Sequence, residues 1–457
     1  MPSEQLLSEK EWTTVVRREL GDAQDFSIID VDAGPLNDKI NGFMGDHIRV
    51  VVTVSVINKE TNRAQERTLK FFLKKLPRKY EFQTDYVISS LVFDKETSMY
   101  ANVLQNYKEV LSDVRENILA SANNDDREEL TGKETLWSSK CLFTGDEVIV
   151  LEDLAEKGFR ISGSACVMDF NHCVVTLRGL AAMHAASFIV EVRKRKMLGD
   201  HYTLLDDYST SLTENFIVNE GENRVKFWFL SSLDALNSLV PHLTKYGKQS
   251  KHYQEVKQKF RATCENIVNF VKPSKKYKNV ICHGDLWSNN IMFSYDEDQE
   301  TPREVRFVDF QMVRYAPPAT DVMMFLQTNT DREFRKAHLE ELLKLYHEEL
   351  NSELRRYGLD ITDVLAWEVF RESCSYYQRF GRIMAALFHH FILLPTDILN
   401  DGIGGPDGYD TFVCGTREKE VQRAFCECEG YRHRLNADLE EIIESMILQD
   451  DTILNQG

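Results

Sequence analysis

The chain has 457 residues, of which 42% are hydrophobic and 28% are charged. It is too long for one ordinary core and too apolar for a disordered protein, so we expect a folded protein of roughly two or three structural units. Its 73 acidic and 55 basic residues give a formal net charge of -18, which argues against a general role in coating nucleic acid or anionic membrane. Small molecules or proteins are the expected partners, with no nucleic acid and no membrane. The sequence gives no indication of an oligomeric state.

The first segment of the chain predicts an amphipathic helix and not a secretory signal. Ser8 and Glu11 have the spacing of a capping box, and Trp12 and Val16 begin a helical period of apolar residues. The nine cysteines are odd in number and scattered, which is typical of free thiols in a reducing compartment. No stretch approaches the ~20 apolar residues that cross a bilayer. We therefore expect a cytoplasmic location.

Alternating β-branched residues from Asp46 to Lys75 predict an antiparallel hairpin, with a polar turn between its strands. A helical period follows at 90–114, and 121–135 is polar and typical of a loop. The segment 141–154, CLFTGDEVIVLEDL, predicts two more strands. The first ~155 residues are therefore expected to be α+β.

Beyond Gly158 helical patterns dominate, notably at 169–196 and 226–271. A short β-rich island at 279–310 interrupts them, with loops between its strands. The last ~100 residues are predicted to be helical and acidic, and they carry no functional signal. Because catalytic residues are often found in loops, the island is the place to look for chemistry.

A group of polar residues in this island has the spacing of a phosphoryl-transfer site. His283, Asp285 and Asn290 form the pattern His-x-Asp-x-x-x-x-Asn, and Asp309 follows after the next strand. Such a site needs one carboxylate to orient the attacking hydroxyl and take its proton. It also needs an amide and a second carboxylate to hold Mg²⁺. A lone His-x-Asp would more simply be a turn, but Asp309 as a correlated second element favours the catalytic interpretation.

A kinase site also needs a strand lysine for the nucleotide phosphates and a helix glutamate to hold that lysine. Lys74, in FFLKKLP, and Glu96, in FDKETSMY, have the right positions. Side chains alternate along a strand, so Lys74 and Lys75 point to opposite faces. We prefer Lys74, and a solvated strand lysine is the alternative.

Taken together, the strings HGDLWSNNIMF, VDFQ, RYAPPATD, VLEDL and LRGLAAMHAASF resemble the ecdysteroid kinase-like (CHK kinase-like) family, which is related to choline kinases and aminoglycoside phosphotransferases. The resemblance implies a bilobed, protein kinase-like α+β fold that binds ATP and Mg²⁺. Residues 1–150 would form a small lobe with an antiparallel sheet, and 151–156 the hinge. Residues 157–457 would form a mostly helical lobe, with the catalytic loop at 283–290.

The resemblance also implies roles for the loop residues. Asp285 would be the catalytic base, with His283 beside it in the catalytic group. Asn290 and Asp309 would hold Mg²⁺. Retention of all these positions favours an active kinase over a silent relative.

For the nucleotide, the resemblance implies that Lys74 binds phosphate and that Glu96 is its partner. The backbone of the hinge, from Glu152 to Leu154, would hold the adenine.

The weakest part of the resemblance is the nucleotide loop at 39–47, which lacks G-x-G-x-x-G. Gly42 and Gly45 would let backbone N–H groups approach the phosphates, and a plain turn is an equally good interpretation.

Two spacings argue against a protein kinase. Leu154 and His283 are 129 positions apart, which leaves room for helices that form a substrate pocket. Asp309 and Asp321 are only 12 apart, too close for a long activation segment. Asp321 is expected either to cap a helix or to brace the catalytic loop.

We therefore expect a kinase that transfers the γ-phosphoryl group of ATP to a hydroxyl of an ecdysteroid-like or other hydroxylated small molecule. The alternative is a catalytically silent nucleotide- or hormone-binding protein with the same fold. The glycine-rich segment 402–408 is expected to be a loop, and the adjacent His389 and His390 are expected in the core or at the surface. The aromatic residues at 227–229 are expected mainly to pack in the core.

Overall fold

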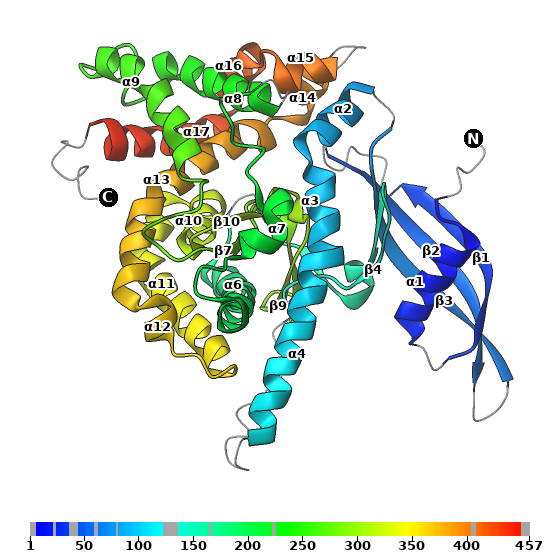
Figure 1. Cartoon of the computed structure of the whole chain (residues 1–457). Helices are drawn as coiled ribbons and strands as arrows, with labels where there is room; N and C mark the ends of the chain where they lie inside the picture. Colours follow the sequence, from blue (N-terminus) through cyan, green and yellow to red (C-terminus); the bar gives the residue numbers. More distant parts are fainter. Residues whose placement is uncertain are drawn as a thin grey trace.

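The computed structural model describes residues 6–21, 24–35, 44–58, 63–78, 81–121, 136–163, 167–221, 225–403 and 408–448. A small lobe built on a twisted antiparallel sheet lies beside a larger, mostly helical lobe (Figure 1). This arrangement is the bilobed, kinase-like α+β fold expected from the sequence.

The small lobe consists of one five-stranded sheet with helix α1 on one face. Its strands run in the order β1-β2-β3-β5-β4, and all pairs are antiparallel. The Ser8–Glu11 capping box begins α1 as predicted. The elements are α1 (Glu9–Leu20), β1 (Phe26–Pro35), β2 (Asp46–Asn58), β3 (Arg63–Lys75), β4 (Cys141–Thr144) and β5 (Val148–Glu152).

The predicted hairpin is confirmed as β2 and β3, in which Asp46 pairs with Lys75. Strands β4 and β5 confirm the pair expected at 141–154. Strand β1 was not predicted. Most of its residues are exposed because it lies at the sheet edge, so its apolar positions do not alternate regularly.

The single helix expected at 90–114 is interrupted and longer. Leu91 has a left-handed backbone (φ 56°), which separates an unpredicted helix, α2, from the next one. The chain then continues through a π-helical turn to Ser121. These elements are α2 (Glu81–Ser90), α3 (Val92–Ser98), the π-turn (Met99–Val103) and α4 (Leu104–Ser121).

The large lobe is built around α6 (Phe170–Leu198), which Asp169 caps as the helical pattern at 169–196 predicts. By length and composition α6 could cross a membrane, but 89% of its apolar stretch is buried within the fold, as in the core helix of a soluble protein. The run expected at 226–271 is two helices, α8 and α9, with a connecting segment between them. The other helices are α7 (Leu204–Leu212), α8 (Val225–Leu239), α9 (Tyr253–Glu265), α10 (Pro318–Asn329), α11 (Arg332–Arg355), α12 (Ile361–Leu365), α13 (Trp367–Ile392), α14 (Thr396–Ile403), α15 (Gly408–Cys414), α16 (Glu418–Glu427) and α17 (Glu429–Ile442).

The predicted β island forms two small antiparallel sheets that hold the central loops. One sheet pairs β7 (Val280–Cys282) with β10 (Arg314–Ala316). The other has the order β6-β8-β9, with β6 (Arg160–Ile161), β8 (Ile291–Tyr295) and β9 (Pro302–Phe307). The loop 283–290 therefore leaves β7 and enters β8, and the chain returns along β9 to Asp309.

Two hydrophobic cores lie on the two sides of the small-lobe sheet. The smaller core joins α1 to one face of the sheet, through residues such as Trp12, Phe71 and Val150. The larger core fills the helical lobe and also contains Phe93 and Met99 of the α3 region. By its packing, α3 therefore belongs to the helical lobe, although the sequence places it within the predicted small lobe of residues 1–150.

Candidate active site

Three charged side chains from distant parts of the chain meet on the sheet face opposite α1. The ammonium group of Lys74, on β3, lies 2.5 Å from Glu96 Oε2 and 2.6 Å from Asp309 Oδ1. Burial alone would lower the pKa of Lys74, but the charges of Asp309 and Glu96 outweigh it and raise that pKa. Lys74 is therefore a fixed positive charge between two carboxylates, one of which is the predicted partner Glu96.

Asp309 has an unusual backbone at the end of β9. Its φ of 68° is left-handed, a conformation that costs a non-glycine residue about 1–2 kcal/mol and often marks a functional site. Its side chain is 25% exposed, whereas the Glu96 side chain is only 2% exposed. Of the two carboxylates on Lys74, Asp309 is the one open to a ligand.

Asp285 and Asn290 lie together in the loop between β7 and β8. The side-chain nitrogen Nδ2 of Asn290 donates to the backbone carbonyl oxygen of Asp285 over 2.9 Å. The side-chain oxygen of Asn290 is therefore the atom left to bind a cation. Burial, and next the negative charge of Asp309, raise the pKa of Asp285 to about 7. A carboxylate with a pKa near neutrality is well matched to accepting and releasing a proton.

His283 holds the backbone of this loop through hydrogen bonds of its ring. It is fully buried; one ring nitrogen, Nδ1, accepts from the backbone N–H of Asp285 at 3.3 Å. The other, Nε2, lies 3.0 Å from the carbonyl oxygen of Val308, next to Asp309. Burial lowers the pKa of His283, so the ring is neutral. The sequence grouped His283 with the catalytic residues, but both ring nitrogens are engaged with backbone, which makes it a positioning residue.

Asp321, on α10, braces the catalytic loop. Its carboxylate accepts from the backbone N–H groups of His283 (2.6 Å) and Gly284 (3.0 Å). Pro317 is the N-cap of α10, so of the two roles expected for Asp321 the structure shows the brace. Burial opposes ionisation of Asp321, but hydrogen bonds, first that from His184, outweigh it and lower the pKa.

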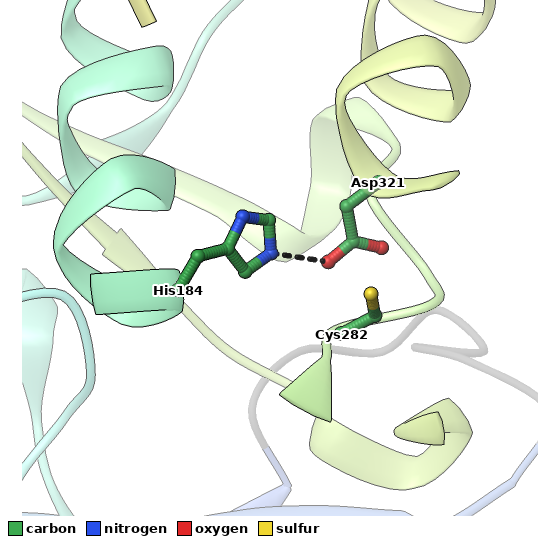
Figure 2. Close-up of side chains that lie close together, drawn as sticks. All are labelled: His184, Cys282 and Asp321. Carbon is green, nitrogen blue, oxygen red and sulfur yellow. Dashed lines mark hydrogen bonds and ion pairs between the residues drawn. The ribbon is translucent and has the colours of Figure 1, made fainter. Parts of the chain in front are cut away.

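A buried trio beneath the loop has ligand atoms close enough to hold a metal ion: His184, Cys282 and Asp321, all within 4.8 Å of one another (Figure 2). Both nitrogens of His184 are already hydrogen-bonded, to Asp321 (3.3 Å) and to the Tyr346 hydroxyl (2.7 Å). The Cys282 thiol lies against the carbonyl oxygen of Ala316 (3.3 Å), and burial raises its pKa well above the ordinary value. We interpret the trio as a hydrogen-bond network that fixes the loop.

A second buried group of charges, Arg314, Glu214 and Lys95, contacts the same loop through Arg314. Arg314 Nη2 donates to the carbonyl oxygen of Gly284 at 3.4 Å, and Arg314 Nε lies 3.1 Å from Glu214 Oε2. Lys95, beside Glu96 on α3, donates to the carbonyl oxygen of Thr213 at 2.8 Å. Burial lowers the pKa of Lys95 to about 8. Arg314 also lowers the pKa of Asp285, against the larger opposing effect of burial.

The predicted hinge follows β5. Glu152 is the last residue of that strand, and Leu154 begins a 3-10 turn (Leu154–Lys157) that Asp153 caps. Asp153 also accepts from Arg49 of β2 at 3.1 Å, which ties the hinge to the sheet. Leu154 is buried.

In the predicted nucleotide loop, Gly45 lies against Lys74. A Cβ atom at position 45 would come within 2.9 Å of Lys74 Cε, so glycine allows the backbone to approach the lysine closely. Gly42 lies outside the described residues.

The donor set fits a magnesium ion. The Asp309 carboxylate and the Asn290 side-chain oxygen are hard oxygen ligands of the type that Mg²⁺ prefers. Burial, and next the charge of Asp309, raise the pKa of Asp285, and a bound cation would favour the ionised form of both carboxylates.

Sequence reasoning missed several residues that shape the site. Gln311 donates to Asp285 Oδ2 at 3.4 Å, and its place in the string VDFQ was the available signal. Arg314 begins the string RYAPPATD, but Glu214 and His184 reach the loop only through the fold. His184 lies in the string LRGLAAMHAASF, although that string gave it no role, and no local pattern marks Glu214.

The fold and the site together define a kinase of the type that phosphorylates small molecules, with a lysine–glutamate pair, a buried loop aspartate and two oxygen donors, Asp309 and Asn290, beside them. The chain belongs to the ecdysteroid kinase-like family, whose model matches residues 39–359.

Several solved structures of kinases match the chain, all with low identity and low TM-scores. The Plasmodium vivax ethanolamine kinase is 13% identical with a TM-score of 0.31, over 94% of this chain and 93% of that chain. A microcompartment-associated aminopropanol kinase is 11% identical with a TM-score of 0.36, over 95% and 98%. The GDP complex of aminoglycoside 2'-phosphotransferase-IIIa is 10% identical with a TM-score of 0.32, over 95% and 98%. No curated protein sequence matches the chain.

Proposed function

We propose that the protein transfers the γ-phosphoryl group of ATP to a hydroxyl group of an ecdysteroid or a similar hydroxylated small molecule. The observation that carries the proposal is the convergence of Lys74, Glu96 and Asp309 in one buried ion group beside Asp285. A structural ion pair would not need the adjacent aspartate with a pKa near 7.

In the proposed reaction, each residue acts on one part of the transfer. Asp285 accepts the hydroxyl proton of the acceptor while the acceptor oxygen bonds to the γ-phosphorus and the bond to the β-phosphate oxygen breaks, which releases ADP. Lys74 pairs with the nucleotide phosphates, and Glu96 holds it in place. Asp309 and Asn290 would hold Mg²⁺, which would supply positive charge that stabilises the transferring group.

The acceptor class rests on the family to which the chain belongs. A hydroxylated steroid, or a hydroxylated foreign compound undergoing detoxification, is consistent with an enzyme that adds charge to an alcohol. A cytoplasmic location is proposed with it, because seven cysteines of the described residues, all except Cys414, have free thiols.

The test is incubation of the purified protein with ATP, Mg²⁺ and a panel of ecdysteroids, other hydroxylated sterols, choline and aminoglycosides, followed by mass spectrometry. A phosphorylated product is expected, and it should fall at least ~100-fold in Asp285→Asn and in Asp309→Asn. Asp298→Asn is the matched control, because Asp298 lies in the exposed turn between β8 and β9.

Unchanged transfer in both active-site variants would contradict the assignment. Binding of ATP without phosphorylation of any acceptor would favour the alternative, a silent nucleotide- or hormone-binding protein.

A further inference from the structure

A cavity of about 560 Å³ lies in the helical lobe, outside the candidate active site. Its walls are α9 with the 3-10 turn that follows it (Asn266–Asn269), α13, and a second π-helical turn (Ile443–Ile447). Helices α9 and α13 lie on the side of the helical lobe away from the small-lobe sheet (Figure 1). None of the active-site residues described above lines the cavity, so it is a separate site.

One wall of the cavity is a row of polar side chains. Lys259, Thr263 and Asn266 line it from α9 and the following turn. Their spacing of four and three residues places them on one face of the helix. Asn266 Oδ1 accepts from Asn269 at 2.7 Å, which leaves the side-chain NH₂ group of Asn266 as a donor. An ammonium, a hydroxyl and an amide group thus line the same wall.

Arg379 faces this row from α13 and has no counter-ion. It is half-buried and makes no hydrogen bond or ion pair with any residue that the structure describes. Glu441 and Glu444, the acids nearest the π-helical turn, each pair with two other cations. Glu265, at the end of α9, pairs with Arg261. Because these acids are already engaged, an anion from solution is the available partner of Arg379.

Lys259 is free to change partners. It pairs with Glu255 at 2.8 Å, and both side chains are exposed. An exposed pair of this kind stabilises a helix very little, so exchange of Glu255 for a ligand costs little. No acidic side chain is among the described residues that line the cavity.

The charge around the cavity is opposite in sign to that of the whole chain. Residues 242–279, which include α9, hold ten basic and two acidic residues, whereas the chain has a formal net charge of -18. A concentrated basic segment attracts anions over a longer range than its direct contacts.

The other part of the lining is apolar. Phe270 is buried and packs against Tyr376 and Tyr377 of α13, with ring centroids 5.1 Å and 6.0 Å away. Met446 lines the cavity from the π-helical turn and is half-buried. Methionine adapts its shape to irregular apolar groups, so the cavity can accept an apolar body as well as an anion.

We propose that this cavity binds a phosphate monoester of an apolar alcohol. A phosphate monoester carries nearly two negative charges at neutral pH, which match the guanidinium of Arg379 and the ammonium of Lys259. Phe270 and Met446 pack against the apolar body. The volume lies within the range of about 300–1,000 Å³ that is usual for small-molecule sites.

This ligand class includes the product of the proposed reaction. The inference does not depend on that reaction, because the cavity shares no residue with the candidate active site. If both hold, the product could occupy the cavity after it leaves Asp285.

The test is calorimetry of the full chain without ATP, with three probes: 1-naphthyl phosphate, 1-naphthol and inorganic phosphate. The naphthyl phosphate should bind at least ~10-fold more tightly than either of the others, because only it fills both parts of the cavity. Arg379→Gln should weaken its binding at least ~10-fold and Lys259→Gln at least ~3-fold.

Matched controls remove the same charges from the same helices. Arg371, on α13, is exposed and pairs with Glu340, and Lys257, on α9, lies against the Tyr253 ring. Neither lines the cavity, so Arg371→Gln and Lys257→Gln should change the affinity less than ~2-fold.

Two further variants complete the test. Lys74→Met removes the phosphate ligand of the candidate active site and should leave the affinity unchanged. Arg379→Lys keeps the charge without the planar fork of donors, so it should retain part of the affinity. It also guards against a misfolded Arg379→Gln, and circular dichroism checks that each variant is folded.

Several outcomes would overturn the inference. They are no binding of naphthyl phosphate at millimolar concentration, binding no tighter than that of inorganic phosphate or naphthol, equal losses in the control variants, undiminished affinity in Arg379→Gln, and loss of binding in Lys74→Met. Phosphorylation of the acceptor panel is measured separately. If naphthyl phosphate binds through Arg379 but no acceptor is phosphorylated, the proposed function fails while the anion site stands.

Discussion

The brace formed by Asp321 allows a quantitative prediction for Asp321→Asn. The carboxylate accepts from two backbone N–H groups, those of His283 and Gly284, and lies 3.3 Å from His184 Nε2. Asparagine has nearly the same shape, but it offers one oxygen and one NH₂ group. One backbone donor therefore loses its acceptor and faces another donor.

The cost follows from two contributions. A hydrogen bond to a charged group contributes about 1.5–3 kcal/mol, and a buried donor left unsatisfied costs about 1–3 kcal/mol. Because Asp321 is fully buried, we expect the free energy of unfolding to fall by about 3–5 kcal/mol. The folded fraction should still bind ATP, but kcat should fall by about 100-fold, because the loop that carries Asp285 is less well positioned.

Urea denaturation followed by circular dichroism measures the first effect, and steady-state phosphorylation measures the second. Asp331→Asn is the matched control. Asp331 is the exposed N-cap of α11 and accepts from Phe334 N–H at 2.7 Å, and asparagine is an equally good N-cap. A loss below about 1 kcal/mol in Asp321→Asn, or equal losses in the two variants, would refute the role of Asp321 as a brace.

Three further predictions follow from the site. Lys74→Met should reduce kcat/KM for ATP at least ~100-fold, whereas Lys75→Met on the opposite strand face should change it less than about 3-fold; equal effects would contradict the assignment. With a pKa raised to about 7, Asp285 takes up a proton as pH falls, so kcat/KM should fall through about pH 7; a flat profile down to pH 5 would contradict its role as base. Gly284→Ala should lower the free energy of unfolding in urea by well over 2 kcal/mol, because the φ of Gly284 is 78° and a Cβ there would lie 2.2 Å from a carbonyl oxygen. Gly358→Ala is the control: its φ is 70°, but a Cβ there would have no backbone atom within 4 Å, so the loss should be about 1–2 kcal/mol. Similar losses in the two variants would contradict the steric argument.

The local parts of the site could be predicted from the sequence, because their residues follow one another on a single loop. His283, Asp285 and Asn290 belong to one short string, and Asp309 ends the next strand. Strand alternation predicts that Lys74 and Lys75 lie on opposite faces of the sheet, but only the fold shows that Lys74 is the one beside Glu96.

The supporting residues could not be predicted, because their partners are distant in sequence. His184 is 137 positions from Asp321, and Arg417 is 185 positions from Ser232. No periodicity or spacing encodes such pairs. His389 and His390 were expected in the core or at the surface, and the structure places both in the core. Only the fold shows that His389 is bonded to Asp438, whereas the ring nitrogens of His390 have no hydrogen-bond partner among the described residues.

Strand β1 and the break at Leu91 were missed for different physical reasons. The strand occupies an edge and is mostly exposed, so it lacks a clear alternation. At Leu91 a left-handed backbone separates two helices without a glycine or proline to mark the change.

The ion pair between Lys74 and Glu96 joins the small-lobe sheet to a helix of the larger core, which the sheet also contacts through Ile149 and Leu151. Lys74 extends from the sheet that packs on α1, whereas Glu96 is on α3, which packs in the larger core through Val92 and Phe93. Lys95 fastens the same helix to Thr213. Helix α3 is thus poorly suited to swing outward as a regulatory switch. A relative motion of the two lobes would instead move the sheet. The Lys74–Glu96 ion pair resists this motion, and because the pair is buried, added salt should weaken it little.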